Sequence, residues 1–195
     1  MFLSMFDPFA RFADVFDRAA LAAPFDHIAM SLATSTPEGH PSCRIVLLHG
    51  VDARGFVFYT NYEGRKAREL EVNPHAALCC YWPWTEEQVR IEGRVARVSA
   101  EESDAYFASR PRGSQIGAWA SRQSEPIASR DELIARVEEV EARYEGRDVP
   151  RPPHWGGYRL APSRIEFWKA EAFRLHFREV YDHTAQGWAR SILSP

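Results

Sequence analysis

An arginine- and serine-rich stretch, Ser109–Ser124, offers the clearest chemistry in this sequence. It reads SRPRGSQIGAWASRQS and places Arg110, Arg112 and Arg122 among serine and glutamine side chains, with one acid, Glu125, close by. Guanidinium groups bind phosphate oxygens in pairs, and hydroxyl groups add further donors. The stretch therefore predicts a loop and a short helix that bind an anionic ligand. The alternative is a solvated basic turn between two helices, because such turns are common in soluble proteins.

A second candidate anion site lies around residues 59–66. Tyr59 and Thr60 end an expected strand, Arg65 and Lys66 begin the helix that follows, and Arg44 begins another strand. A helix N-terminus that is preceded by hydroxyl groups and followed by cations suits a phosphate group. The alternative is that the cations of this helix form one exposed face without a ligand.

A third candidate is the sequence RLHFR near the C-terminus, at residues 174–178. If these residues form one strand, then Arg174, His176 and Arg178 share a face, which indicates an anion or a polar ligand beside them. His176 can act there as a general base near neutral pH, or only as a hydrogen-bond donor. The alternative is an exposed, polar sheet face.

Several common catalytic signatures are absent from the sequence. There is no nucleophile elbow, Walker loop, Rossmann glycine fingerprint or metalloprotease motif. The three cysteines, Cys43, Cys79 and Cys80, have no zinc-ligand spacing, so we expect reduced thiols and no metal. Any redox chemistry would need an organic cofactor.

The composition indicates an ordinary soluble domain. The chain has 195 residues, of which 45% are apolar and 26% charged, with a net charge of −3. One domain with a sizeable core suits this length, and the charge implies no general affinity for nucleic acid or acidic membranes. The N-terminus lacks the features of a signal peptide, and no apolar run is long enough to span a bilayer. We therefore expect a cytoplasmic protein.

The elements that must position these residues are mostly strands. An apolar stripe predicts an N-terminal helix that ends near Ala22; its residues are Phe2, Phe6, Phe9, Ala13 and Phe16. A three-stranded meander should follow at 27–35, 44–49 and 56–60, with the apolar middle strand buried. We expect a helix at 63–72 and further strands at 76–82 and 88–98.

The second half of the chain should continue with helices and then return to strands. Helices are expected at 100–109, 114–120 and 129–143, and a proline-rich surface linker at 149–153. Strands are expected at 157–160, 164–169, 174–181 and 188–193. The chain thus divides into an N-terminal helix (1–23), barrel strands (24–99), a helical insertion (100–145) and C-terminal strands (156–195). The predicted fold is mainly β with helical insertions, an antiparallel barrel of the α+β class.

Taken together, the motifs resemble one known family. The order RIVLL, FYTN, GRKA, Gln88, SRPR, SQIGAW, QS, WGG, IEFW and RLH, from about Pro8 to Pro195, resembles pyridoxamine 5'-phosphate oxidase, also called pyridoxal 5'-phosphate synthase. The resemblance implies an FMN-binding split β-barrel that forms a homodimer with FMN at the subunit interface. It also implies that the flavin oxidises a phosphorylated B6 vitamer, pyridoxamine or pyridoxine 5'-phosphate, at C4' to give pyridoxal 5'-phosphate. O2 would then reoxidise the flavin and form hydrogen peroxide.

The resemblance also assigns roles to individual residues by position. The FMN residues it implies are Arg44, Ile45, Val46, Leu47, Tyr59, Thr60, Arg65, Lys66, Gln88, Gln123, Ser124, Trp168 and Arg178. The substrate phosphate would be held by Tyr106, Arg110 and Ser114, with His49 beside them. Arg174 and His176 would lie over the substrate ring as the catalytic pair.

This sequence departs from the family pattern in two places. The family usually has a lysine where this chain has His49, and its N-terminal arm is expected to be mostly missing before Phe6. The related phenazine-biosynthesis oxidases show that the scaffold can change substrate. Two alternatives therefore stand beside the B6 phosphate oxidase: a flavin oxidase of the same fold with another anionic substrate, and an FMN-binding protein without turnover.

Overall fold

The computed structural model describes residues 7–195, so Phe2 and Phe6 of the expected stripe lie outside the described residues. Helix α1 (Pro8–Leu21) begins where the Asp7 carboxylate accepts a hydrogen bond from the Phe9 amide and proline occupies the first turn. Phe12, Val15 and Ala19 are buried against the sheet. The apolar spacing thus predicted the helix correctly but not its buried face, because Phe9 and Phe16 are only half-buried and Ala13 is exposed.

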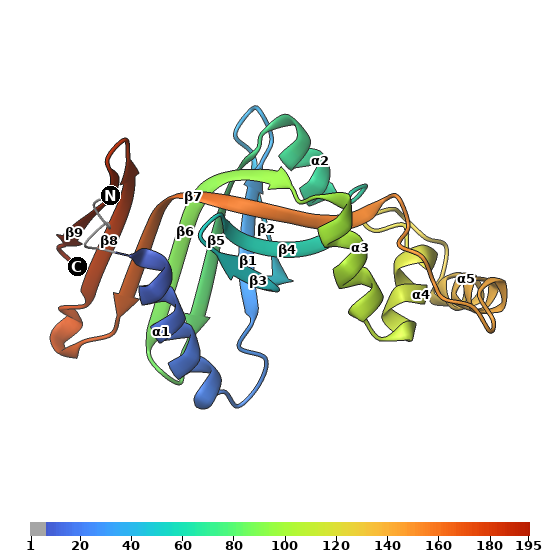
Figure 1. Ribbon diagram of the computed structural model, residues 1–195, viewed down its shortest axis with the longest axis horizontal. Helices are drawn as coiled ribbons and strands as arrows, with labels where there is room; N and C mark the ends of the chain where they lie inside the picture. Colours follow the sequence, from blue (N-terminus) through green and yellow to red (C-terminus); the bar gives the residue numbers. More distant parts are fainter. Residues whose placement is uncertain (1–6) are drawn as a thin grey trace.

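The strands form one curled sheet in which every pairing is antiparallel (Figure 1). The sheet order is β2-β1-β5-β6-β7-β4-β3, and β8 pairs with both β7 and β9. The strands are β1 (Ala29–Ser35), β2 (Pro41–Leu47), β3 (Gly50–Asp52), β4 (Gly55–Asn61), β5 (His75–Trp82), β6 (Glu87–Arg97), β7 (Trp155–Lys169), β8 (Phe177–Thr184) and β9 (Gly187–Leu193).

Strand β7 connects the two ends of the molecule. Its first part pairs with β4 and its last part with β8, while β6 runs along both. The sequence predicted two strands here, at 157–160 and 164–169, which is wrong. A register shift beside Gly93 absorbs the extra residue after Pro162, so the strand continues through a proline that would otherwise mark a turn.

Two expectations about β2 are also wrong. The meander does not form, because β2 pairs with β1 while β4 pairs with β3 and β7. The strand is not buried either, since Ile45 is 63% and Leu47 38% exposed. A continuous apolar run indicates that both faces are covered, but β2 ends the order of the described sheet and one of its faces is open.

The further helices have close to the expected bounds: α2 (Arg65–Val72), α3 (Ala100–Ser109), α4 (Arg112–Ala120) and α5 (Arg130–Arg143). Helix α2 packs against the main core through Ala67 and Leu70, whereas α3, α4 and α5 pack around a second, smaller core. Phe107, Ile116, Val140 and Trp155 form this cluster together with Val149. The 149–153 segment is therefore not only a surface linker, because Val149 is buried within the cluster.

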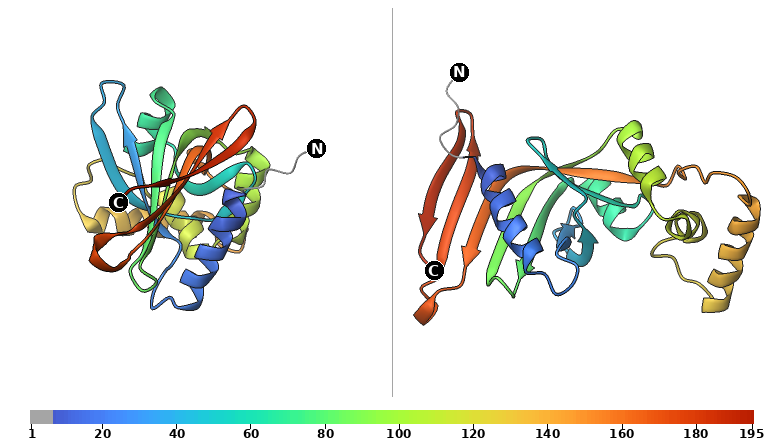
Figure 2. Two further views of the ribbon diagram at one scale, coloured as in Figure 1. Left: turned by 90° about the vertical axis from the view of Figure 1, so that its left-hand side faces the viewer. Right: turned by 60° about the horizontal axis from the view of Figure 1, so that its bottom comes forward.

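The C-terminal strands form a hairpin at the opposite end of the molecule from α4 and α5 (Figure 2). The strand expected at 174–181 begins and ends three residues later, since β8 runs from Phe177 to Thr184 and a short 3-10 turn (Ala172–Arg174) precedes it. Phe173 and Arg174 have φ values of 58° and 62°, in the left-handed region. Arg174 and His176 consequently do not share a strand face with Arg178, because alternation requires extended backbone.

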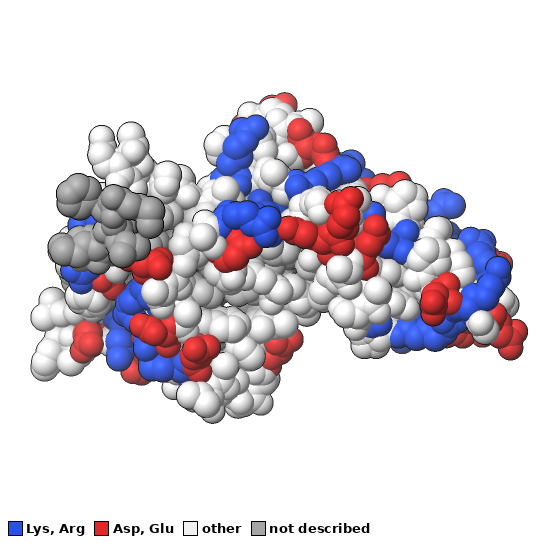
Figure 3. Space-filling view, viewed as in Figure 1, with Lys and Arg blue, Asp and Glu red and all other residues white. Residues whose placement is uncertain are grey.

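The surface carries no continuous basic region on the face shown in Figure 3, where Lys and Arg are interspersed with Asp and Glu. Among the described residues, no helix is long and apolar enough to cross a membrane.

Candidate functional site

A cavity of about 1060 Å³ lies between the β2, β4 and α2 region and the helices α3 and α4. It brings the first two candidate anion sites together, although they are far apart in the sequence. The expected site residues that line it are Arg44, Ile45, Val46, Leu47, His49, Tyr59, Thr60, Arg65, Lys66, Tyr106, Arg110, Ser114, Gln123 and Ser124.

Lys66 is the most buried cation of the cavity, with 8% of the residue exposed. Its ammonium group donates to Thr60 Oγ1 at 3.1 Å and to Gln123 Oε1 at 2.6 Å, both neutral acceptors. No carboxylate within the described residues forms an ion pair with it. Burial lowers the pKa of Lys66, and the nearby Arg44 lowers it further. A buried cation with neutral partners favours an anionic ligand.

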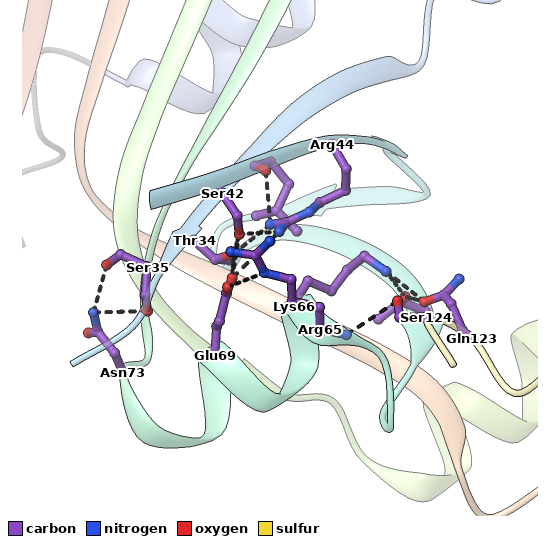
Figure 4. Close-up of polar contacts among 12 residues, drawn as sticks. Thr34, Ser35, Ser42, Arg44, Arg65, Lys66, Glu69, Asn73, Gln123 and Ser124 are labelled. Carbon is purple, nitrogen blue, oxygen red and sulfur yellow. Dashed lines mark hydrogen bonds and ion pairs between the residues drawn. The ribbon is translucent and has the colours of Figure 1, made fainter. Parts of the chain in front are cut away.

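Arg44 and Arg65 lie beside Lys66, bound to a buried carboxylate (Figure 4). Glu69 accepts from Arg65 Nε at 2.9 Å and lies 3.5 Å from Arg44 Nη2. The helix that carries Arg65 and Lys66 begins at Gly64, which provides no side-chain cap, and Ser124 Oγ lies 3.5 Å from the Arg65 amide. This end of the cavity thus combines three cations with a helix N-terminus whose cap residue has no side chain, an arrangement that suits a phosphate group.

The other end of the cavity is aromatic and also carries a cation. Tyr59 and Tyr106 stack with centroids 3.9 Å apart, and Tyr59 stacks on Trp155 at 5.5 Å. The Arg110 guanidinium lies 4.6 Å from the Trp155 ring centroid, and its buried Nη1 atom has no hydrogen-bond partner. Burial lowers the pKa of Arg110. A buried guanidinium nitrogen without a partner needs an acceptor, which an anionic ligand would supply.

His49 is exposed at this end and does not point into the barrel core. The Tyr106 hydroxyl lies 3.0 Å from its Nδ1 and 2.9 Å from its Nε2. Partial burial beside the rings of Tyr59 and Tyr106 lowers the pKa of His49, the charge of Arg110 lowers it further, and Asp26 opposes both. The imidazole is therefore mostly neutral at pH 7 when no anion is bound.

The remaining expected site residues do not line this cavity; they are Gln88, Trp168, Arg174, His176 and Arg178. They lie near the far end of β7, where Trp168 is opposite Gln88 on β6 and Arg178 on β8. The Trp168 and His176 rings are 4.8 Å apart, and Arg178 binds the buried Glu166 at 2.9 Å. At a rise of about 3.3 Å per residue, the 15 residues of β7 extend over roughly 45 Å. One chain thus holds two separate groups of site residues.

Sequence reasoning missed several residues that shape the cavity. Glu69, Thr34 and Ser42 hold Arg44 and Arg65, and Trp155 forms the aromatic wall. The spacing of Arg65 and Glu69, four residues apart in a helix, was a usable signal for one of these contacts. The contacts of Thr34 and Trp155 join distant parts of the chain, and no local pattern reveals them.

Comparison with known proteins decides the family. Residues 16–144 match the family described as "Pyridoxamine 5'-phosphate oxidase", and residues 155–195 match "Pyridoxine 5'-phosphate oxidase C-terminal dimerisation region". The chain belongs to the pyridoxamine 5'-phosphate oxidase family. Such membership makes it an oxidoreductase, as the sequence motifs predicted.

Similar curated proteins carry the same name. A pyridoxine/pyridoxamine 5'-phosphate oxidase of Rubrobacter xylanophilus is 59% identical over 189 residues, which are 97% of this chain and 87% of that protein. One from Myxococcus xanthus is 58% identical over 189 residues, covering 97% of this chain and 92% of the relative.

Solved structures confirm the expected fold class. PhzG from Burkholderia lata, in complex with tetrahydrophenazine-1-carboxylic acid, superposes with a TM-score of 0.92 at 33% identity and covers 97% of this chain and 93% of its own. A pyridoxamine 5'-phosphate oxidase-related, FMN-binding protein from Nostoc punctiforme gives a TM-score of 0.77 at 18% identity, with full coverage of both chains. The second likeness shows the fold alone, a split β-barrel.

Proposed function

We propose that this protein uses FMN to oxidise pyridoxamine 5'-phosphate, pyridoxine 5'-phosphate or both to pyridoxal 5'-phosphate, with O2 reduced to hydrogen peroxide. The observation that carries the proposal is a cavity with two cationic ends, at Lys66 and at Arg110, of which the Arg110 end is lined by aromatic side chains. Two anion sites in one cavity suit two phosphorylated ligands whose rings must meet.

The Lys66 end suits the phosphate of FMN. Arg44, Arg65 and Lys66 supply positive charge, and Thr60 and Ser124 supply hydroxyl groups beside the uncapped helix. Bound FMN would supply a two-electron acceptor that O2 can reoxidise. The residues expected along the flavin are Ile45, Val46, Leu47, Tyr59 and Gln123, all of which line the cavity.

The Arg110 end suits the substrate phosphate. Arg110 offers its unpartnered Nη1, and Tyr106 and Ser114 offer hydroxyl groups at the same cavity wall. His49 adds a donor that becomes a cation when a phosphate dianion raises its pKa. These residues bind and orient the substrate, and they leave its ring free to contact the flavin.

The second group of residues completes the site only if two chains associate. Gln88, Trp168 and Arg178 would contact FMN, and Arg174 and His176 the substrate ring, from a second subunit. The match of residues 155–195 to a dimerisation region supports a homodimer. Exposed apolar side chains also support it: Ile45 and Leu47 on β2, and Ile192 on the C-terminal hairpin. Arg174 would polarise the ring by its charge, and His176 would hold its edge by a hydrogen bond.

The proposal is tested by mixing the FMN-loaded protein with pyridoxamine 5'-phosphate without oxygen. We expect the flavin absorbance near the visible maximum to bleach and to return when air is admitted, with hydrogen peroxide formed. If a tetrahydrophenazine carboxylic acid bleaches the flavin and B6 phosphates do not, the chain is a flavin oxidase for another anion. If no candidate bleaches it, FMN binding without turnover is the function.

A further inference from the structure

Glu69 forms ion pairs with two cations of the Lys66 end, Arg44 and Arg65, as no other carboxylate of residues 7–195 does (Figure 4). It lies on α2 with 6% of the residue exposed. Oε1 accepts from Arg65 Nε at 2.9 Å, and Oε2 accepts from Ser42 Oγ at 2.6 Å and from the Thr34 hydroxyl. Its contacts therefore join α2 to β1 and β2 at the bottom of the cavity.

Arg44 is fixed by the same cluster. Its guanidinium donates to the Thr34 and Ser42 hydroxyl groups and to the Leu32 carbonyl at 3.3 Å, and Glu69 lies 3.5 Å away. Both hydroxyl groups thus bind Arg44 on one side and Glu69 on the other. If Glu69 loses its charge, each of these donors loses an ionic acceptor, and the two arginines lose their common anchor.

We propose that Glu69 is a positioning residue that orients Arg44 and Arg65 toward the FMN phosphate. It acts through the arginines and does not itself touch the ligand, since Glu69 is not among the residues that line the cavity. The inference rests on the proposed function only for the identity of the anion. Hydrogen bonds from Ser42, Thr34 and Arg65 lower the pKa of Glu69 to about 2 despite its burial, so the anchor stays ionised at any working pH.

Charge alone predicts the opposite effect of removing Glu69. Arg44, Arg65 and Lys66 against one carboxylate leave a surplus of two positive charges, which matches a phosphate dianion. Glu69→Gln raises that surplus and, by charge alone, should tighten binding of FMN. A positioning role predicts weaker binding, because two guanidinium groups no longer present their donors together. The sign of the change therefore separates the two explanations.

The experiment measures the dissociation constants of FMN and of riboflavin, which lacks the phosphate, by flavin fluorescence with apoprotein. We expect Glu69→Gln to raise the FMN constant roughly tenfold to a hundredfold and to leave the riboflavin constant within about twofold. Glu71→Gln is the matched control, because Glu71 lies on the same helix but binds Arg97 and Tyr158. It should change neither constant.

Other outcomes contradict the inference. A lower or unchanged FMN constant in Glu69→Gln means that the carboxylate only balances charge, and an equal rise for FMN and riboflavin means that it only supports the fold. Thr34→Val, a milder change that removes the hydroxyl group that donates to Glu69 and accepts from Arg44, should move the FMN constant in the same direction. If the unaltered protein binds neither FMN nor riboflavin, the proposed function is wrong. If the unaltered protein binds FMN and Glu69→Gln binds it equally tightly, only the role of Glu69 is wrong.

Discussion

At the scale of single residues, Lys66 is a cation whose burial lowers the stability of the folded apoprotein. Because its pKa is lowered in the folded state, the protonated lysine costs free energy at every pH below its unfolded value of about 10.4. The cost is full at pH values below the lowered pKa and shrinks as the pH rises from there to the unfolded pKa. A bound phosphate offsets it, which is how such a residue can be retained at a ligand site.

We expect Lys66→Met to stabilise the apoprotein and to abolish tight FMN binding. A gain of about 1 kcal/mol corresponds to a rise in Tm of roughly 2–4 °C for a chain of this size. The measurement is thermal unfolding of both apoproteins at pH 7 and pH 10, where the difference should be smaller. A variant that is less stable at pH 7 and still binds FMN would show that Lys66 is an ordinary structural lysine.

Arg110 and Arg174 should fail in different ways when each is replaced by alanine. Arg110 would contact a phosphate that does not change during the reaction, so its loss should raise KM by roughly tenfold to a hundredfold, or about 1.5–3 kcal/mol, with kcat little altered. Arg174 would lie over the reacting ring, so its loss should lower kcat as well. Steady-state kinetics of both variants checks this, and two variants that alter only KM would remove the catalytic role from Arg174.

His49 should make substrate binding depend on pH. Burial and Arg110 hold its pKa below 6.5 in the free protein, whereas a bound phosphate dianion favours the protonated form. Proton uptake on binding then means that KM rises as the pH increases above the lowered pKa, after the ionisation of the substrate itself is subtracted.

His49→Lys removes this dependence and should tighten binding at pH 8 by about fivefold, on the order of 1 kcal/mol. His49→Asn, which cannot be protonated, should flatten the profile without tightening binding. A profile that is identical in all three proteins would show that His49 does not face the substrate phosphate.

At the scale of elements, the hairpin of β8 and β9 presents apolar side chains to solvent in a single chain. Ile192 is 53% exposed and lies within the matched dimerisation region. We expect Ile192→Glu to convert the dimer largely to monomer and to weaken FMN binding, as a buried unpaired carboxylate would at an interface. Leu21, 90% exposed at the end of α1, provides the control variant Leu21→Glu. Analytical ultracentrifugation should show that the control variant is still a dimer. If Ile192→Glu is a dimer as well, the hairpin is not an interface.

The sequence predicted elements better than it predicted their neighbours. Local signals sufficed to predict the helices from α2 to α5, and the loop and short helix of the serine-rich stretch, because capping residues, prolines and apolar spacing act over a few residues. They failed for the pairing of β2 and for the continuity of β7, which depend on contacts between distant strands. The turn at Phe173 and Arg174 was missed because an alternating sequence predicts a strand.

The same limit applies to the site. The cations that line the cavity could be proposed from their types and from the family resemblance, and the structure brings them together. The role of the buried Glu69 and the stacking of Tyr59 on Trp155 could not be predicted from the sequence, because these contacts form only in the folded chain.

At the scale of the whole molecule, the residues that line the cavity and the group around Trp168 lie at opposite ends of β7. Our central claim is that each active site combines the cavity of one subunit with the Trp168 group of the other. The most direct test mixes Arg110→Ala and Arg174→Ala after dissociation and reassociation, and assays them at a substrate concentration well below the raised KM of Arg110→Ala, where each variant alone has little activity. If sites are shared, half of the dimers are hybrids, and one of the two sites in each hybrid carries neither change. We predict recovery of about a quarter of the unaltered activity. If hybrids form but no activity returns, each site belongs to a single chain and the claim is wrong.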